Sequence, residues 1–192
     1  MADEDRIRWD ERYRGSGPAI GPDPFLVVIA DRLPDRGRAL DVAGGLGGNA
    51  TWLAARGLAV TLADISGVAL EHAARASKSA GVEIATRQVD LEAASCPAGP
   101  WDVIACVRFL HRPLLAGLAA VAAPGGLLVV VHPTARNLER HERPGRRFLL
   151  DEGELPGLLD GWDILHHEEA WAGGPGGRHE ARCLARRGDR DG

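Results

Sequence analysis

Residues 38–57 read RALDVAGGLGGNATWLAARG and pass from a short apolar run through a glycine-rich turn into a segment of helical composition. A strand that leads through glycines into the start of a helix points backbone N–H groups at a ligand. Gly45, Gly47 and Ala50 fit the pattern G-x-G-x-x-A. Asp64 follows about 20 residues further on, where a ribose hydroxyl would be bound. The stretch predicts a cofactor loop, and by itself it fits a nicotinamide-dependent enzyme.

Short apolar runs alternate with helical stretches along most of the chain. The expected strands cover 38–43, 59–64, 82–90, 101–107 and 126–132. The expected helices lie at 48–56, 66–80 and 113–122, and a further helix is expected at 25–33. Such alternation implies parallel strands joined by right-handed crossovers, with helices on both faces of the sheet and ligands at the carboxyl ends of the strands.

The pattern changes in the last part of the chain. Residues 161–171 and 180–187 are strand-like, and the glycine-rich connector AGGPGGRH lies between them at 172–179. This arrangement predicts an antiparallel hairpin at one edge of the sheet. The expected fold class is therefore α/β, with a Rossmann-like, doubly wound, seven-stranded sheet that is mostly parallel and carries an antiparallel C-terminal hairpin strand.

Composition and charge limit the class of protein. The chain has 192 residues, a net charge of -4, 45% hydrophobic and 26% charged residues, which is typical of one globular domain. The charge gives no global attraction for nucleic acid or anionic lipid, and no apolar run approaches the roughly 18 residues that span a bilayer. The three cysteines show no C-x-x-C spacing, so neither a disulfide framework nor a zinc site is indicated. We expect a cytoplasmic monomer or homodimer with no metal, no nucleic-acid partner and no membrane partner.

Asp41 separates the two classes of cofactor that a glycine-rich turn can hold. It lies four positions before Gly45, at the carboxyl end of the first expected strand. A carboxylate there would repel a pyrophosphate, whereas it would attract the amino group of a methionine moiety. A second acid, Asp90, closes the third expected strand, and residues 43–50 contain no arginine or lysine. The loop therefore suits a cationic ligand.

At these residues the sequence resembles the class I S-adenosylmethionine-dependent methyltransferases, whose first motif is an acid, a hydrophobic residue and then G-x-G-x-G. The motif stands here as DVAGGLG, residues 41–47, with Ala43 in place of the first glycine. LAARGLAVTLADIS, VDLE and WDVIACVRFLH follow in the order of the family. The chain looks most like the small tellurite-resistance-type methyltransferases, because of WDERYR at 9–14, GGNA at 47–50, and LHRPLL followed later by FLLDEGEL.

The resemblance implies a cofactor, S-adenosylmethionine, a product, S-adenosylhomocysteine, and a set of cofactor-binding residues. Asp41 would lie near the methionine end and Asp64 would accept from the ribose hydroxyls. Ile65 and Leu91 would lie beside the adenine, Asp90 would accept from the adenine amino group, and Arg108 would lie near the methionine moiety. The turn residues carried over are Ala43, Gly45, Gly47 and Asn49. Trp9, Arg12 and Tyr13 would fold over the cofactor, with Arg12 as a partner for its carboxylate. For each charged residue a surface or helix-capping role is the alternative.

The resemblance also divides the chain. We expect a single methyltransferase domain over 1–192, with an N-terminal lid and helices at 1–34, a cofactor-binding core at 35–134, and an acceptor-side loop with the C-terminal hairpin at 135–188. The arginine-rich segment 132–148 would border the acceptor, so either it selects an anionic acceptor or it is a solvated loop with no role in selectivity.

Methyl transfer from a sulfonium is an in-line displacement in which charge is lost, so a general base is optional. An acceptor that needs help in losing a proton would find it in His111 or His132, which end the fourth and fifth expected strands. The sequence predicts an enzyme that transfers a methyl group to a small-molecule acceptor. The alternatives are an NAD(P)-dependent oxidoreductase and a non-catalytic protein that binds S-adenosylmethionine.

Overall fold

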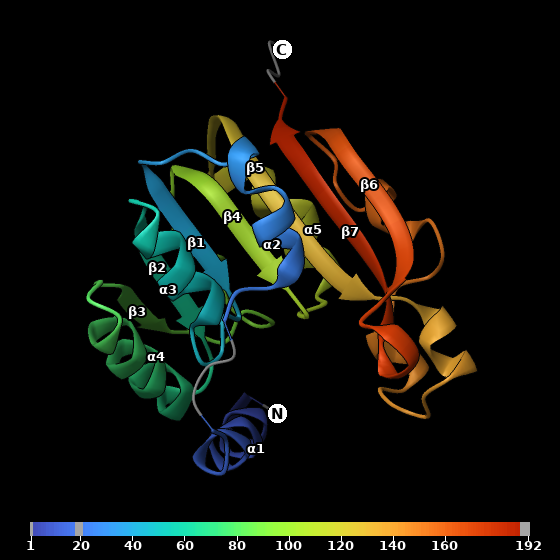
Figure 1. The fold of residues 1–192 in the computed structure, drawn as a ribbon, viewed down its shortest axis with the longest axis horizontal. Coiled ribbons are helices and arrows are strands. Elements are labelled where there is room, and N and C mark those ends of the chain that lie inside the picture. The colour runs from blue at the N-terminus through green and yellow to red at the C-terminus, as the bar shows by residue number, and fades with distance from the viewer. Residues whose placement is uncertain (1, 18–20, 189–192) are drawn as a thin grey trace.

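The fold is built on one seven-stranded sheet with the strand order β3-β2-β1-β4-β5-β7-β6 (Figure 1). The computed structural model describes residues 2–17 and 21–188. The strands are β1 (Arg38–Val42), β2 (Ala59–Asp64), β3 (Ala85–Gln88), β4 (Trp101–Val107), β5 (Ala122–Pro133), β6 (Trp162–Ala172) and β7 (Arg178–Arg187). The pairs from β3 to β5 are parallel, and β7 is antiparallel to both β5 and β6. The predicted fold class is confirmed, including the antiparallel hairpin at the edge.

Helices cover both faces of the sheet. They are α1 (Ala2–Arg14), α2 (Pro24–Val28), α3 (Gly48–Ala55), α4 (Gly67–Ser79), α5 (Arg112–Gly117) and α6 (Glu154–Gly157), with short 3-10 helices η1 (Ala30–Arg32), η2 (Leu118–Val121), η3 (Ala135–Glu139), η4 (Arg146–Phe148) and η5 (Gly174–Gly176). In Figure 1, α2, α3 and α4 lie in front of the sheet and α5 lies behind it. Leu53 of α3 and Leu115 of α5 accordingly belong to two different buried clusters.

The apolar runs of the sequence arise because the central strands are buried on both faces. In β4, Val103 and Ala105 pack into the cluster under α2, α3 and α4, whereas Ile104 and Cys106 pack into the cluster on the α5 side. Alternate residues of a strand point to opposite faces, so a strand that is covered twice needs a continuous apolar run. This requirement is met by the sequence VIAC.

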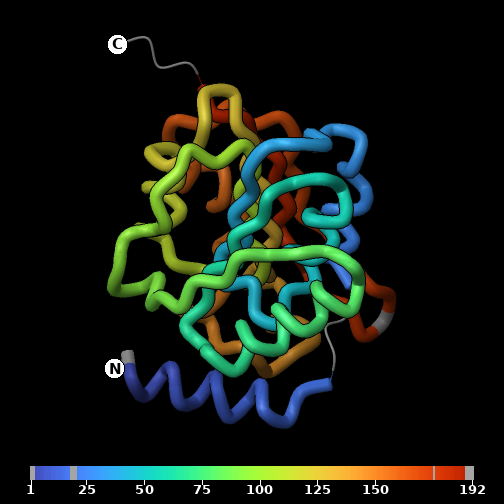
Figure 2. Tube along the Cα trace, turned by 90° about the vertical axis from the view of Figure 1, so that its left-hand side faces the viewer, coloured from blue at the N-terminus to red at the C-terminus, as the bar shows by residue number. Residues whose placement is uncertain are grey.

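The functional end of the sheet is set by its connectivity. The strand order reverses beside β1, because β2 lies on one side of it and β4 on the other. Ligands of open α/β sheets bind at the carboxyl ends of the strands at such a reversal. The arrowheads of β1 and β4 point toward the edge along which α1 lies, and a view turned by 90° shows α1 across the same end (Figures 1 and 2).

Four predicted elements differ from those observed. The strand expected at 82–90 is only β3, whose four residues are exposed because it has a single neighbouring strand at the sheet edge. The helix expected at 25–33 is the short α2 followed by η1. The helix expected at 113–122 ends at 117, and the chain then enters η2 and β5. β5 begins before Pro124 and not at 126, and a register shift between Trp101 and Val103 accommodates the extra residues.

Within the described part of the chain, no helix combines the length and the apolar character that a membrane span requires.

Substituting Gly47 tests the geometry of the turn that leads into α3. Gly47 has a φ of 79°, and a Cβ there would lie 2.6 Å from the Cβ of Ala73 in α4. A left-handed alanine costs about 1–2 kcal/mol, and the overlap with Ala73 adds to that cost. We expect Gly47→Ala to lower the free energy of unfolding by at least about 2 kcal/mol, measured by urea denaturation.

Gly117 supplies the matched control. It has a φ of -90° at the end of α5, and a Cβ there would meet no atom within 4 Å. Gly117→Ala should leave stability unchanged or raise it by up to about 1 kcal/mol. Equal effects of the two substitutions would contradict the packing of α3 on α4 described above.

Candidate functional site

Two buried aspartates accept hydrogen bonds from the backbone of the glycine-rich turn and of the start of α3. Asp64, the last residue of β2, accepts from the N–H of Gly45 at Oδ2 and from the N–H of Ser66 at Oδ1, both at 2.9 Å. Burial raises the pKa of the Asp64 carboxyl, while the two backbone hydrogen bonds oppose that shift. The carboxylate predicted to bind ribose is therefore at the carboxyl edge of the sheet, beside the turn.

Asp41 is completely buried beneath the start of α3. Its Oδ2 accepts from the N–H of Ala50 at 3.1 Å. Asp41 therefore caps α3, which is the helix-capping role given above as the alternative to cofactor binding. Its Oδ1 has no hydrogen-bond partner among the residues that the structure describes. Burial raises the pKa of Asp41 to about 7. A buried carboxyl oxygen without a donor is costly, and such groups gather at functional sites.

Left-handed backbone conformations bring the turn close to its neighbours. Ala43 adopts a φ of 52° although it is not a glycine, and Gly45 has a φ of 54°. The alanine that departs from the family motif therefore keeps the conformation of a glycine, at a cost of about 1 kcal/mol. A Cβ at Gly45 would lie 2.7 Å from the hydroxyl oxygen of Tyr13, so this glycine is needed where α1 approaches the turn.

The N-terminal helix lies over the site through the residues of the WDERYR motif. The rings of Trp9 and Tyr13 are stacked with centroids 5.7 Å apart, and the guanidinium of Arg12 lies over the Trp9 ring at 5.3 Å. Burial, assisted by the charge of Asp64, raises the pKa of Tyr13 to about 12. The three residues predicted to fold over the cofactor are thus brought together at the edge, although Arg12 is exposed.

Asp10, a residue that sequence reasoning missed, fastens α1 to the body of the protein. It is buried, and its Oδ1 accepts from the hydroxyl of Ser66 at 2.6 Å and from the N–H of Val68 at 3.3 Å. The hydrogen bond from Ser66 lowers the pKa of Asp10. Ser66 also caps α4 by accepting from the N–H of Ala69. Asp10 lies within WDERYR, so the motif signals its place, but no feature of the sequence names its partner.

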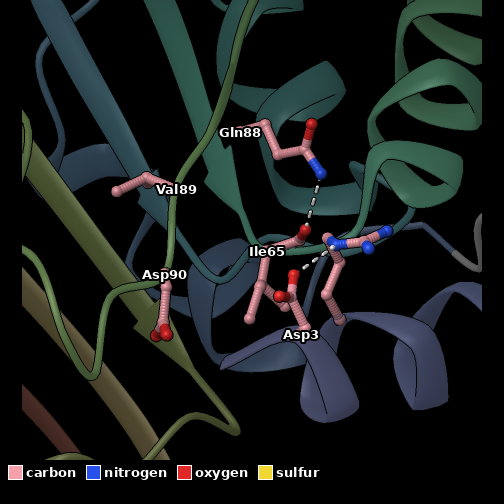
Figure 3. A pocket seen from close by; sticks show the side chains of 6 residues that line it. Asp3, Ile65, Gln88, Val89 and Asp90 are labelled. Atoms are coloured by element: carbon pink, nitrogen blue, oxygen red, sulfur yellow. Dashed lines mark hydrogen bonds and ion pairs between the residues drawn. The ribbon is translucent and has the colours of Figure 1, made fainter. Parts of the chain in front are cut away.

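A cavity of about 450 Å³ opens beside the end of β2 (Figure 3). Its lining includes Ile65 and Asp90, which were predicted to flank adenine. Figure 3 shows Asp90 across from Ile65 and Asp3, and the amide of Gln88 donating to the carbonyl of Ile65 at 3.0 Å. The remaining lining residues are Asp3, Arg6, Gln88 and Val89, none of which was predicted.

Asp90 and Leu91, both predicted to contact the adenine, also make contacts within the protein. Asp90 accepts from the N–H of Glu92 at 2.9 Å, which is the turn-forming contact weighed as its alternative role. Leu91 is 4% exposed and packs into the core on the α5 side, and it does not line the cavity.

At the other end of the site, Arg108 lies among acidic residues. It follows β4 with a left-handed φ of 60°, and its guanidinium lies 3.4 Å from Asp23 and 3.9 Å from Glu180. The backbone N–H of Asp23 donates to Oδ1 of Asn49 at 2.8 Å. Asn49, a predicted cofactor residue, therefore connects the start of α3 to the segment that precedes α2.

The two candidate histidines have different surroundings. His132 is buried, and its Nε2 lies 2.9 Å from the carbonyl oxygen of Phe148, so Nε2 carries the proton and donates it to that carbonyl. Burial lowers the pKa of His132 to about 4. His111 precedes α5 as its N-terminal cap residue, and its Nδ1 is buried with no hydrogen-bond partner in the described chain. The structure thus gives His132 a contact that holds the loop at Phe148.

Two motifs that the sequence placed far apart meet at the carboxyl end of β4. Arg112 of LHRPLL forms a bidentate ion pair with Glu154 of FLLDEGEL, with Nη2 of Arg112 2.9 Å from Oε2 of Glu154. Arg112 also donates to the carbonyl of Leu149 at 3.2 Å. The sequence marked both motifs, but the contact between them needs the fold.

The arginines of the acceptor-side loop are largely occupied by their own neighbourhood. Arg136 lies 3.2 Å from Glu139, and Arg146 pairs with Asp151. Arg140 lies over the ring of Trp171 at 3.7 Å, and Arg147 lies over the ring of Phe148. The ion pairs offset the charges of Arg136 and Arg146, whereas Arg140 and Arg147 keep their positive charge against the rings.

Comparison with known proteins relates this site to a family. A family model for a methyltransferase domain matches residues 39–126, which include the glycine-rich turn and both buried aspartates. This match and the fold support a class I S-adenosylmethionine-dependent methyltransferase. The cofactor of this family is S-adenosylmethionine, and the match decides against a nicotinamide-dependent oxidoreductase.

A curated relative shares part of this sequence. The tRNA 5-carboxymethoxyuridine methyltransferase of Escherichia coli (strain K12) is 30% identical over 137 residues, which are 67% of this chain and 52% of the relative. The chain thus spans about half the length of the curated relatives that it matches.

Solved structures share the fold. TehB from Haemophilus influenzae superposes with a TM-score of 0.74 at 20% identity, over 95% of this chain and 67% of that chain. Magnesium protoporphyrin IX methyltransferase from Synechocystis PCC 6803 with bound S-adenosylhomocysteine superposes with a TM-score of 0.71 at 18% identity, over 98% and 95% of the two chains.

The residues present fit S-adenosylmethionine. Asp64 lies at the strand end beside the Gly45 turn, the Ile65 cavity adjoins it, and the free oxygen of Asp41 lies beneath the turn. The turn brings no basic side chain against the positive charge of the sulfonium, because residues 43–50 contain none.

Substituting Asp64 tests the ribose contact. A buried bidentate hydrogen bond is worth at least about 1.4 kcal/mol, so Asp64→Ala should weaken the binding of S-adenosylhomocysteine more than about tenfold by calorimetry. Asp102→Ala is the matched control, because Asp102 also accepts a backbone N–H, from Arg38 at 2.7 Å, but at the amino end of β4. Asp102→Ala should bind S-adenosylhomocysteine as tightly as the parent protein does. If Asp64→Ala also bound it as tightly as the parent, the ribose contact would be refuted.

The pH dependence of stability tests the burial of Asp41. Its folded pKa of about 7 exceeds the usual aspartate pKa of 3.8, so the unfolded state releases its proton at lower pH than the folded state. Ionisation therefore favours unfolding as pH rises through this interval. Compared with the parent, Asp41→Asn should be more stable at pH 8, and this advantage should shrink as the pH falls toward 4, in urea unfolding at each pH. Asp31→Asn, at an exposed acid of η1, is the control; an advantage of Asp41→Asn that does not vary with pH would disprove the assignment.

Proposed function

We propose that this protein transfers the methyl group of S-adenosylmethionine to a small-molecule acceptor. The observation that carries the proposal is the pair of buried aspartates, Asp41 and Asp64, that accept backbone hydrogen bonds at the sheet reversal. The glycine-rich turn that they hold contains no basic residue. We further propose that residues 1–192 act as one methyltransferase domain with the division into lid, core and acceptor side described above. The cytoplasmic location and the monomeric or homodimeric state stay predictions.

The binding roles follow from position in the site. Asp64 would accept from the ribose hydroxyls, and Ile65 and Asp90 would flank the adenine in the cavity beside β2. The turn at Ala43, Gly45, Gly47 and Asn49, with Asp41 beneath it, would carry the methionine moiety. When bound, S-adenosylmethionine supplies a methyl group on a positively charged sulfur.

The lid gives the reaction the environment that it needs. Charge is neutralised when a sulfonium transfers its methyl group to an anion, and it is spread over both partners in the transition state when the acceptor is neutral, so exclusion of water favours the transition state. Trp9 and Tyr13 of α1 lie over the turn, and Asp10 holds the helix there through Ser66. The contribution of this chain is therefore alignment and dehydration more than proton transfer.

The histidines restrict the kind of acceptor. His132 donates its Nε2–H to the Phe148 carbonyl, and its other ring nitrogen is buried without a partner in the described residues, so it is poorly placed to take a proton from an acceptor. His111 is the better candidate for a base. An acceptor that arrives nucleophilic, such as a thiol, a selenol or a reduced tellurium oxyanion, needs neither.

The acceptor-side loop supports a small molecule over a nucleic acid. Of the two interpretations of the segment 132–148, a selective basic surface and a loop without selectivity, the pairs of Arg136 and Arg146 with acids favour the second. The tRNA methyltransferase to which this chain is similar makes tRNA the macromolecular acceptor to test.

A transfer assay with methyl-labelled S-adenosylmethionine tests the proposal. We expect S-adenosylhomocysteine to form, and label to appear in a low-molecular-mass fraction, with at least one member of a panel of thiols, selenite and tellurite under reducing conditions. Asp64→Ala should form product at less than about a tenth of the parent rate at a cofactor concentration below KM.

Two other results would exclude the small-molecule proposal. Label in precipitated tRNA but not in the small-molecule fraction would make tRNA the acceptor. Tight binding of S-adenosylhomocysteine without turnover on the panel or on tRNA would instead support a non-catalytic protein that binds the cofactor.

A further inference from the structure

Arg108 is the residue at the site whose geometry the roles above leave unexplained. Its backbone is left-handed at φ 60°, a conformation that is strained for a residue other than glycine, and such strain gathers at functional sites. Its side chain is 53% exposed, whereas the side chains of Asp23 and Glu180, which it contacts, are 4% and 7% exposed. A half-exposed cation is therefore held from behind by two buried acids.

The two acids come from elements far apart in the sequence. Asp23 precedes α2, where its Oδ1 caps the helix by accepting from the N–H of Phe25 and its Oδ2 accepts from Nη2 of Arg108. Glu180 lies near the start of β7 and is shared with Arg182, 3.5 Å away. Three elements thus converge on one guanidinium at the carboxyl end of β4.

This guanidinium lies at the methionine end of the site. The N–H of Asp23 donates to Asn49, which stands at the start of α3, directly after the glycine-rich turn. Arg108 itself follows β4, the strand on the other side of the reversal from β2 and its cavity. The adenine cavity and Arg108 therefore occupy opposite sides of β1.

The chemistry of the cofactor supplies an anion at that end. S-adenosylmethionine carries a carboxylate on its methionine moiety, and a guanidinium is the side chain that binds a carboxylate with the best-matched geometry. Asp23 and Glu180 both approach Nη2 of Arg108, and the half-exposed side chain leaves other donors of the guanidinium open to a ligand. Fixing a long side chain before the ligand arrives reduces the entropy lost on binding.

We propose that Asp23 and Glu180 are positioning residues that hold Arg108 so that its guanidinium binds the carboxylate of the cofactor's methionine moiety. The inference rests on the assignment of the cofactor and is independent of the acceptor. It adds two acids that no motif of the sequence marked, and it places the carboxylate contact on β4 rather than on Arg12 of the lid.

The test compares two ligands that differ in the amino-acid moiety. S-adenosylhomocysteine has the carboxylate, and 5′-methylthioadenosine lacks the whole amino-acid group. The measured quantity is the ratio of their dissociation constants, obtained by calorimetry. A charge-assisted hydrogen bond is worth about 1.5–3 kcal/mol, so Arg108→Met should reduce the preference for S-adenosylhomocysteine about 10- to 100-fold and leave the affinity for 5′-methylthioadenosine unchanged.

Variants of the two acids separate positioning from charge and from folding. Glu180→Gln removes a negative charge beside Arg108, and by charge alone it would strengthen carboxylate binding. Positioning predicts the opposite, a loss of about threefold or more in the preference for S-adenosylhomocysteine. Asp23→Ser keeps a cap for α2 but cannot hold Arg108, and it should show a loss of similar size. In the Arg108→Met background neither substitution should change the ratio further.

Two other arginines complete the experiment. Arg186→Met, at an exposed position near the end of β7 and the opposite edge of the sheet, should keep the parent ratio. Arg12→Met should reduce the ratio less than Arg108→Met does.

Three results would overturn the proposal: an unchanged ratio in Arg108→Met, a parent or raised ratio in both Glu180→Gln and Asp23→Ser, or a larger loss in Arg12→Met. Failure of the parent protein to bind either ligand would remove the cofactor assignment itself, and is thereby distinguished from a failure of this proposal alone.

Discussion

The structure depends on two buried carboxylates that accept hydrogen bonds from the backbone of one turn and of the helix that follows it. Asp64 accepts from the N–H of Gly45 and Asp41 accepts from the N–H of Ala50, so the ends of two adjacent parallel strands hold the turn and the start of α3. Burying two acids this close raises the pKa of each of them, which is a cost to stability. A fold that needed only a helix cap would be served by one serine or asparagine. The second acid and the free oxygen of Asp41 fit the proposed cofactor site, in which a ligand would supply the missing donor.

The lid depends on the same strand end. Ser66 follows Asp64 by two residues, donates its N–H to Asp64 and its hydroxyl to Asp10, and accepts from the start of α4. One serine therefore joins the carboxylate of Asp64, helix α1 and helix α4. Because Asp10 is ionised in this contact and its pKa is lowered, α1 is held by a charge-assisted hydrogen bond and not by apolar packing alone. The position of the lid is thus coupled to the backbone that would carry the cofactor.

Much of the architecture could be predicted because it is encoded locally. The β1 run, the glycine-rich turn and Asp64 define the sheet reversal within 27 residues, and the apolar runs of β4 and β5 follow from burial on both faces. The predictions were wrong where competing signals overlapped: the helix was expected to run to 122 and the next strand to begin at 126, yet pairing with β4 begins at Ala122 and a register shift accommodates the additional residues. Leu91 lies beside a predicted adenine residue in sequence, but it packs into the core.

The contacts that sequence reasoning missed are all between distant segments. Asp10 with Ser66, Arg112 with Glu154, and Arg108 with Asp23 and Glu180 join residues separated by 42 positions or more. Neither spacing nor composition constrains such pairs, since each partner alone resembles an ordinary polar or charged surface residue.

Two kinds of contact build the two sides of the site. The glycine-rich turn is held through a backbone N–H, that of Gly45, and Ala43 adopts a left-handed φ of 52° in this turn without being a glycine. The segment after β4 is held by a side-chain pair, the bidentate contact of Arg112 with Glu154. A substitution in the turn that keeps the backbone conformation therefore leaves the N–H contact in place, whereas a change of either member of the pair leaves the other charge without its partner.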